Sequence, residues 1–315
     1  MRVANSCTWM GDGYCNMKTI HLLTIGNSLA ENPLTYLADI ARSEGSLQFE
    51  IGRCNLSGCS LKKHWNLALY TQTHPEHKTY QLDLGMTLPP VPGGKQRSAN
   101  LQEALVAEPW DYVTLNQGSL PGWRRETFQP YLGFLHDLVR ELAPQAQIFL
   151  NQTWAYRSDA PYLPQNGLTE ELMLEHLRAN YAAFAAELGC RLIPCGEAVQ
   201  QVRRAPGRIF SWPDPEFDFQ NAEAPTLPRQ EHSLSIGWNW IINDSMEGVP
   251  DLSLDFNHLN AAGCYLTGCT WFECLTSLDV RPVTFRPSEV DAGYATFLRE
   301  NAHDVSRRYG PLPKD

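Results

Sequence analysis

The sequence has no apolar run of the roughly 18 residues that crossing a bilayer requires, and it has few cations for its length. Among its 315 residues, 25 are Lys or Arg and 35 are Asp or Glu, which gives a net charge of −10 at pH 7. Nucleic acids and anionic membrane surfaces select for proteins with basic patches. We therefore expect neither nucleic acid nor a membrane as a partner.

The first residues lack the basic start and the apolar segment of a secretory signal. We expect residues 1–16 to be a flexible N-terminal extension and residues 17–315 to form a single domain. The nine cysteines are an odd number, which favours free thiols in a reducing compartment and hence a cytoplasmic protein. Pairs such as Cys54 and Cys59 are spaced more widely than zinc sites prefer, so we expect no metal and no cofactor.

What the sequence does contain is an alternation of short apolar runs with helical patterns. The apolar runs predict strands at residues 19–25, 47–53, 111–115, 146–150 and 191–194. Apolar residues at helical spacing predict helices at residues 33–43, 126–142, 169–188, 195–204, 260–275 and 287–301. Because short continuous apolar runs suit buried parallel strands, this order predicts an α/β protein, a three-layer α/β/α sandwich around a five-stranded, mostly parallel sheet.

Two stretches interrupt this alternation, at about 71–98 and 205–251. The first contains Pro89-Pro90-Val91-Pro92-Gly93-Gly94, and the second is rich in Pro and aromatic residues without a period. Loop insertions of this length are usually functional covers or binding walls, and surface insertions without a role are the alternative. Because the second stretch leads directly into Asp255 and His258, we interpret it as the wall of a substrate pocket.

Ser28 follows Gly26 and Asn27 at the expected end of the first strand, just before a helix. In open α/β sheets ligands bind at that edge, and a helix N-terminus there favours developing negative charge. The alternative is that Ser28 only caps the helix, since Ser is a preferred N-cap residue.

Asp255 and His258 form a D-x-x-H sequence on an expected loop that enters a helix. Such a carboxylate can bond one ring nitrogen of the histidine while the other nitrogen faces a nucleophile. A turn aspartate and a surface histidine would be the simpler interpretation of this motif alone.

Together these blocks resemble the SGNH (GDSL-like) hydrolase superfamily, over roughly residues 19–277. The resemblance implies a flavodoxin-like fold, with Ser28 as nucleophile, His258 as general base and Asp255 as the residue that orients the base. It also implies an oxyanion hole made by the backbone N–H groups of Ser28 and Gly58, the latter in Leu56-Ser57-Gly58-Cys59-Ser60, together with a side-chain amide.

The third block departs from the superfamily's usual G-x-N-D and is Asn116-Gln117-Gly118-Ser119. It is more similar to the Q-G-E block of carbohydrate acetylesterases in that superfamily, which implies Gln117 as the amide donor, with Asn116 as the competing choice. A bacterial branch of the superfamily is more similar still, on Gly58-Cys59-Ser60-Leu61, Gln152-Thr153-Trp154-Ala155-Tyr156 and His258-Leu259-Asn260.

Two other enzyme classes fit less well. Gly26-Asn27-Ser28-Leu29-Ala30 lacks the last glycine of the G-x-S-x-G nucleophile elbow, and the nucleophile of α/β-hydrolases follows several strands rather than the first. The first strand–helix turn also lacks the G-x-G-x-x-G of dinucleotide-binding proteins.

We therefore expect a serine esterase whose substrate is a small-molecule or glycan ester, most of all an O-acetyl group on a sugar. Trp65 and Trp154 lie just beyond predicted strand ends and are expected to stack on a sugar ring. Asn27 and His64, from the first two blocks, complete the expected substrate-binding set. A general short-chain esterase or lipase, or a non-catalytic carbohydrate-binding protein on the same fold, are the alternatives.

Overall fold

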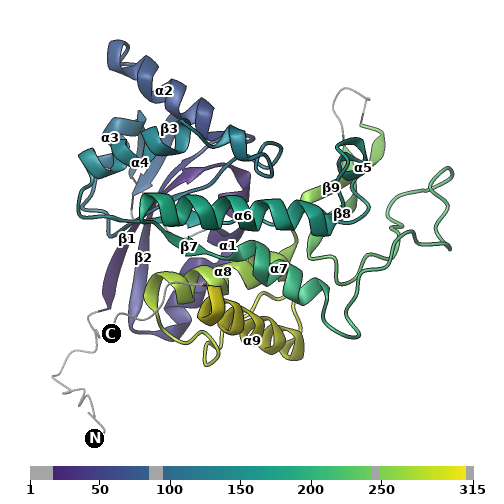
Figure 1. The fold of residues 1–315 in the computed structure, drawn as a ribbon. Coiled ribbons are helices and arrows are strands. Elements are labelled where there is room, and N and C mark those ends of the chain that lie inside the picture. Colours follow the sequence, from purple (N-terminus) through teal and green to yellow (C-terminus); the bar gives the residue numbers. More distant parts are fainter. Residues whose placement is uncertain (1–16, 85–94, 243–247, 310–315) are drawn as a thin grey trace, which may run out of the picture.

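Five parallel strands form the central sheet of the protein (Figure 1). The structure is a computed structural model that describes residues 17–84, 95–242 and 248–309. The strands are β1 Lys18–Gly26, β2 Leu47–Asn55, β5 Tyr112–Leu115, β6 Gln147–Asn151 and β7 Arg191–Ile193, in the order β2-β1-β5-β6-β7. Every neighbouring pair in this sheet is parallel. The predicted α/β architecture and the predicted positions of all five strands are confirmed.

Helices cover both faces of the sheet and bury one apolar cluster on each. One face carries α1 Ser28–Glu44, α7 Cys195–Arg203, α8 Ala261–Thr276 and α9 Ala292–Tyr309. The other face carries α2 Leu61–Thr73, α3 Leu101–Leu105, α4 Tyr131–Leu142 and α6 Glu170–Leu188. Because successive side chains of a strand point to opposite faces, Leu22 of β1 joins the first cluster and Leu23 the second.

Several helix boundaries differ from the prediction for local reasons. Helix α1 starts at Ser28, well before Pro33, because the Asn27 side chain accepts a hydrogen bond from the N–H of Leu29 and caps the helix there. Helix α4 starts only at Tyr131, since Arg125–Thr127 is a 3-10 turn. Helix α9 lies later in the chain than predicted. The short helix α5 Tyr162–Gln165 and helices α2 and α3 were not predicted.

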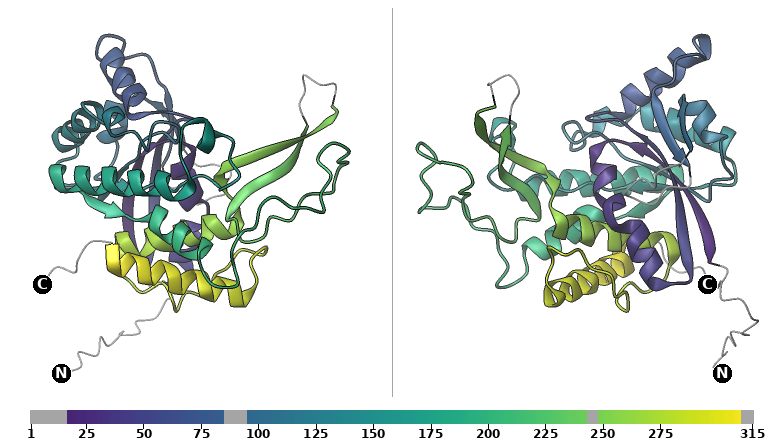
Figure 2. Two further views of the ribbon diagram at one scale, coloured as in Figure 1. Left: turned by 45° about the vertical axis from the view of Figure 1, so that its right-hand side comes forward. Right: turned by 180° about the vertical axis from the view of Figure 1, so that it is seen from behind.

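The two stretches expected to be loop insertions contain antiparallel hairpins, so that expectation is wrong in part. Strand β3 Tyr80–Leu84 pairs with β4 Lys95–Ala99, and β8 Ser235–Ile242 pairs with β9 Pro250–Leu259. Figure 2 shows the β8–β9 hairpin reaching away from the sandwich beside the long segment that precedes it. The expected flexible extension at residues 1–16 and the Pro-Gly stretch at 89–94 lie outside the described residues.

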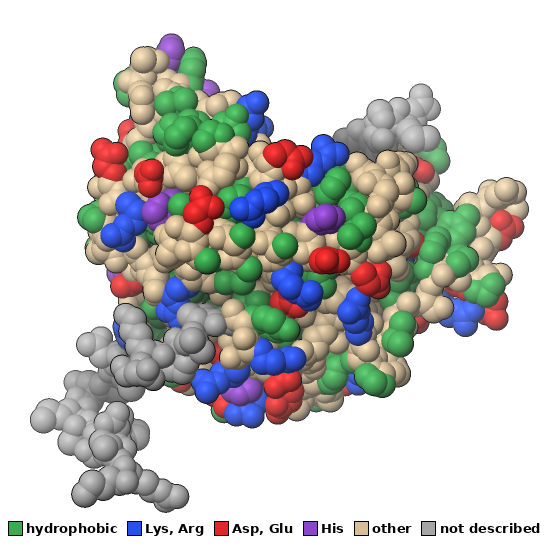
Figure 3. Space-filling view, viewed as in Figure 1, with side chains coloured by type: hydrophobic (Ala, Val, Ile, Leu, Met, Phe, Trp, Pro, Cys, Tyr) green, Lys and Arg blue, Asp and Glu red, His purple; other side chains and the backbone are tan. Residues whose placement is uncertain are grey.

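The long segment folds onto the hairpin through aromatic side chains. Trp212 stacks on Trp238 at a centroid distance of 6.0 Å, and Phe219 lies 4.9 Å from the same ring. Hydrophobic side chains gather on this projecting part of the surface, at the right of Figure 3. We call the described part of residues 205–259 the hairpin arm. It brings the end of β9, and with it Asp255 and His258, to the sandwich.

Candidate active site

Ser28 is the first residue of α1 and follows the carboxyl end of β1, an inner strand of the sheet between β2 and β5. Asn27 is the N-cap, because its Oδ1 accepts from the N–H of Leu29 at 3.1 Å, so the alternative that Ser28 merely caps the helix is wrong. The Ser28 hydroxyl is thereby free for another partner. It lies 2.8 Å from Nε2 of His258, which is 230 positions away in the chain.

Asp255 contacts both the ring and the backbone of His258. Its Oδ2 lies 2.8 Å from His258 Nδ1, and its Oδ1 accepts from the backbone N–H of His258 at 3.0 Å. Burial raises the pKa of Asp255, but the hydrogen bonds from His258 outweigh burial and hold the pKa below its ordinary value. The carboxylate therefore stays ionised at neutral pH and can stabilise a protonated imidazole.

A bulge in strand β9 explains how two residues three positions apart can meet. In a regular strand such residues point to opposite faces of the sheet. Here Ser235 pairs with Leu259 and Gly237 pairs with Asp255, so the three residues 256–258 lie opposite the single residue Ile236. The extra residues turn the backbone and bring the two side chains together. Asp255 and His258 thus lie in a bulged strand rather than on the expected loop.

The turn that contains Gly58 is tied to the turn that contains Ser28. The Leu56 N–H donates to the Gly26 carbonyl at 3.1 Å, and the Asn27 side-chain amide donates to the Cys59 carbonyl at 3.0 Å. Gly58 has a φ of +62°, in the left-handed region that favours glycine, and it is exposed. The N–H of Ser28 is one of the first-turn groups of α1 that have no partner within the helix.

Neither candidate amide is free to complete an oxyanion hole. Gln117 Nε2 donates to the carbonyl oxygen of Thr127 at 2.8 Å, and its Oε1 accepts from the N–H of Leu61. Gln117 is only 1% exposed, so its assignment as the amide donor is wrong in this structure. Asn116 Nδ2 donates to Asn27 Oδ1 and to the carbonyl of Gln117, both at 3.1 Å. The Gln117 side chain instead joins Thr127 to the start of α2, and the Asn116 amide holds the side chain of Asn27, next to Ser28.

Of the four residues expected to bind substrate, Asn27, His64 and Trp154 are buried and Trp65 is half buried. Asn27 is 1% exposed and its amide binds backbone. Trp154 is 1% exposed, with its indole N–H on the Asn257 carbonyl, and Trp65 packs on Phe134 of α4. The expectation of an exposed aromatic platform is therefore wrong for Trp154, which the hairpin arm covers.

His64 is completely buried and connects three elements. Its Nε2 lies 2.7 Å from the Gly26 carbonyl of β1 and its Nδ1 lies 2.8 Å from the Tyr80 hydroxyl of β3. Burial lowers the pKa of His64 to about 4, so the ring is neutral at pH 7. A neutral imidazole with no exposed surface braces the carboxyl end of β1, which does not support the expected role in substrate binding.

Sequence reasoning missed a buried ion pair whose arginine, Arg157, also attaches the hairpin arm to the sandwich. The guanidinium of Arg157 donates to both carboxylate oxygens of Asp159 at 2.7 Å, and both side chains are fully buried. Arg157 also donates to Gln230 Oε1 at 2.8 Å, and a side chain at Gly237 would collide with this pair. The only signal in the sequence is that Arg157 and Asp159 follow shortly after two aromatic residues. This signal does not identify Gln230, which is 73 positions away from Arg157.

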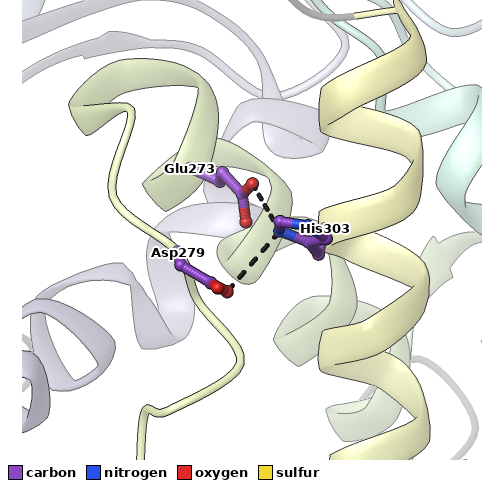
Figure 4. Close-up of side chains that lie close together, drawn as sticks. All are labelled: Glu273, Asp279 and His303. Carbon is purple, nitrogen blue, oxygen red and sulfur yellow. Dashed lines mark ion pairs between the residues drawn. The ribbon is translucent and has the colours of Figure 1, made fainter.

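A second cluster of ionisable side chains lies away from Ser28, where helices α8 and α9 meet. Glu273 of α8 and Asp279 of the following loop point toward His303 of α9 (Figure 4). His303 Nδ1 lies 2.8 Å from Glu273 Oε1 and 3.5 Å from Asp279 Oδ1. Hydrogen bonds from Arg281 lower the pKa of Asp279 to about 2. These side chains have protein partners, so we interpret the cluster as an ion-pair network that joins α8 to α9.

None of the helices within 17–84, 95–242 and 248–309 combines the length and the apolar character needed to cross a bilayer.

The comparisons with known proteins concern the fold. A family model described as "Domain of unknown function (DUF4886)" matches residues 21–205. Among solved structures, a DUF4886 family protein from Bacteroides uniformis ATCC 8492 has 22% sequence identity and a TM-score of 0.68, over 91% of this chain and 95% of that chain. At this identity the similarity shows the fold alone.

Two further structures are more distant. A proposed SGNH hydrolase from Slackia heliotrinireducens has 19% identity and a TM-score of 0.42, over 62% of this chain and 89% of that chain. A member of the lipolytic protein G-D-S-L family from Veillonella parvula DSM 2008 has 11% identity and a TM-score of 0.40, over 82% and 100%. Similarities at these TM-scores carry no argument. No curated protein matches the sequence.

Proposed function

The chain belongs to the DUF4886 family, and from the hydrogen-bonded order Ser28–His258–Asp255 we propose that it is a serine hydrolase of carboxylic esters. The single observation that carries the proposal is the position of the His258 ring. One ring nitrogen lies 2.8 Å from a serine hydroxyl at a helix N-terminus, and the other lies 2.8 Å from an ionised carboxylate.

The first chemical step in this proposal forms an acyl-enzyme. Ser28 Oγ attacks the ester carbonyl carbon while His258 Nε2 takes the hydroxyl proton. The tetrahedral intermediate then collapses, the carbon–oxygen bond to the alcohol breaks, and His258 returns the proton to the leaving alcohol. Asp255 stabilises the imidazolium during both transfers. The alcohol leaves and the acyl group stays on Ser28.

The second step releases the acid. His258 removes a proton from a water molecule, whose oxygen attacks the acyl carbon, and the proton passes to Ser28 Oγ as that bond breaks. In both steps negative charge develops on the carbonyl oxygen. The N–H groups of Ser28 and Gly58 are suited to stabilise it, and one such donor is typically worth about 10²–10³ in turnover. With Gln117 and Asn116 engaged elsewhere, the proposed oxyanion hole is made of backbone alone.

For the alcohol part of the substrate, we retain the O-acetylated sugar as the first candidate. It rests on the resemblance of the third block to carbohydrate acetylesterases. The tryptophans add no support, because Trp154 is buried and Trp65 packs on Phe134. A short-chain esterase without sugar preference is the competing proposal. Initial rates on acetylated sugars, compared with p-nitrophenyl acetate, butyrate and octanoate, separate the two.

Replacement of the nucleophile tests the proposal directly. Purified wild type and Ser28→Ala would be assayed on p-nitrophenyl acetate and treated with a fluorophosphonate probe. We expect the variant to lose at least about 10³-fold in kcat, since the members of a triad act as a unit. We also expect the probe to modify Ser28 in the wild type and not to react with the variant.

Ser43→Ala is the matched control, because Ser43 is on the same helix at the opposite end, bonded to Thr284. It should keep wild-type activity. Full activity in Ser28→Ala would refute the nucleophile. A wild type that binds glycans but neither hydrolyses any ester nor reacts with the probe would favour the non-catalytic carbohydrate-binding alternative.

A further inference from the structure

The bulged segment around His258 is attached to the sandwich at Phe256, Asn257 and Leu259. The Phe256 carbonyl accepts from the backbone N–H of Arg157 at 3.1 Å, and the Asn257 carbonyl accepts from the indole N–H of Trp154 at 2.7 Å. The N–H of Leu259 donates to Asn32 Oδ1 of α1 at 3.1 Å. A bulge disrupts the ladder of its own hairpin, so these contacts replace the missing interstrand bonds.

The contact from Trp154 acts on the peptide unit next to the imidazole. The Asn257 carbonyl and the His258 N–H belong to one peptide bond, which is planar. The carbonyl end is held by the indole of Trp154, and the N–H end donates to Asp255 Oδ1 at 3.0 Å. A peptide unit fixed at both ends cannot rotate, and the Cα of His258 is fixed with it.

Trp154 itself is rigidly placed. It follows β6, is 1% exposed and packs in the apolar cluster shared by α1 and α8. Without the indole N–H, the half-buried Asn257 carbonyl would lose its donor, and a carbonyl that is held away from water without a donor costs free energy. The local way to recover that free energy is a rotation of the peptide toward another donor or water, which would also turn His258.

We propose that Trp154 is a positioning residue, whose indole N–H holds the Asn257–His258 peptide so that the imidazole bridges Asp255 and Ser28. This inference rests on the proposed serine hydrolase function. Both chemical steps use the same imidazole, so its misplacement lowers kcat and leaves KM nearly unchanged. A displacement of about 1 Å in a reacting group can cost about 10²-fold in rate.

Trp154→Phe removes the N–H and keeps an aromatic ring in the cluster. Trp110→Phe is the matched control, because Trp110 is also fully buried and also donates its indole N–H to a backbone carbonyl, that of Ala104 at 2.9 Å. It packs in the cluster on the other face of the sheet. We expect kcat to fall by about 10- to 10²-fold in Trp154→Phe, with KM within twofold of wild type. Trp110→Phe should keep the wild-type kcat.

The rate of fluorophosphonate labelling of Ser28 should fall by a similar factor in Trp154→Phe only. If that variant does not fold, 3-benzothienylalanine at position 154 replaces the N–H by sulfur with almost no change of shape. Equal kcat losses in the two Phe variants, or a loss confined to KM, would overturn the inference. Ser28→Ala in the same assay separates the two proposals, because an active Ser28→Ala refutes the hydrolase function itself, whatever Trp154→Phe does.

Discussion

Two carboxylate–histidine pairs in this protein have the same short contact but different surroundings. In both the pair Asp255–His258 and the pair Glu273–His303, a carboxylate oxygen lies 2.8 Å from Nδ1 of the histidine. The first pair is at the carboxyl ends of the strands, where His258 Nε2 faces the hydroxyl of Ser28. The second pair joins α8 to α9, with a second carboxylate, Asp279, beside it.

The electrostatic states of the two carboxylates differ as well. Burial is the largest influence on both, but in Asp255 the hydrogen bonds from His258 overcome it and the pKa lies below its ordinary value. In Glu273, which is 6% exposed, burial prevails and the pKa is raised. The comparison teaches that a short carboxylate–imidazole contact does not identify a catalytic pair. A serine hydroxyl at the second nitrogen and a carboxylate that stays ionised distinguish the first pair from the second.

Replacing each of the two histidines with alanine should give the largest difference in kcat between the two pairs. His258→Ala removes the general base, and we expect kcat on p-nitrophenyl acetate to fall by about 10⁴-fold or more. His303→Ala removes only an ion pair between helices and should keep kcat within twofold. Circular dichroism of both variants would show that the difference is not due to unfolding. Comparable losses of activity in the two folded variants would contradict the distinction between the pairs.

Neutralising the carboxylate of each pair should give a smaller difference in kcat between the two pairs. Asp255→Asn keeps the shape of the side chain but removes the charge that stabilises the imidazolium, and we expect kcat to fall by about 10²–10⁴-fold. Glu273→Gln should leave kcat unchanged. An Asp255→Asn variant as active as Glu273→Gln would exclude Asp255 from the catalytic group.

Glu273→Gln should instead change how the free energy of unfolding depends on pH. Because the folded-state pKa of Glu273 is raised, its contribution is fully present below the ordinary Glu value and is lost as the pH rises through the folded value. The unfolding free energy of the wild type minus that of the variant should therefore decrease as the pH is raised above 4.5. Urea denaturation of both proteins from pH 4 to 8 measures this difference.

His64 extends the comparison to a histidine without any carboxylate partner. Its folded pKa of about 4 lies below the ordinary 6.5, so its contribution to stability is present above pH 6.5 and is lost as the pH falls to 4. The shift corresponds to about 3 kcal/mol, on the basis of about 1.4 kcal/mol per pKa unit.

His64→Gln cannot titrate, and its unfolding free energy should change less than that of the wild type between pH 6.5 and 4. Urea denaturation at several pH values gives both curves. A constant difference between the two proteins over this range would show that the imidazole does not protonate on unfolding.

Local patterns in the sequence were sufficient for the sheet. The apolar runs around Leu22 and Phe149 predicted strands correctly because burial between two helical layers requires uninterrupted apolar residues. Helix α1 was placed too late because the prediction used only the apolar spacing of residues 33–43, whereas the Asn27 cap lies earlier. Strands β8 and β9 were missed because their residues are half buried and pair with each other rather than with the sheet.

Side-chain partners were the weakest part of the sequence prediction. Gln117 and Asn116 were both considered as amide donors, but the Gln117 amide donates to the Thr127 carbonyl and the Asn116 amide donates to the Asn27 side chain. Trp154 was expected to face a sugar, yet its partner is Asn257, 103 positions away. Nothing near Trp154 in the chain signals that the arm covers it.

The sequence by itself determined the five strands of the sheet and most of the helices that flank them, and it contained a serine, a histidine and a carboxylate in motifs typical of ester hydrolysis. Periodicity and capping act over a few residues, so such features can be recognised without the fold. Only the tertiary structure decided that His258 meets Ser28, that Glu273 and His303 join α8 to α9, and that the amides near Ser28 are engaged. These outcomes depend on which distant segments compete for each donor and acceptor, and that competition is resolved only when the chain is packed.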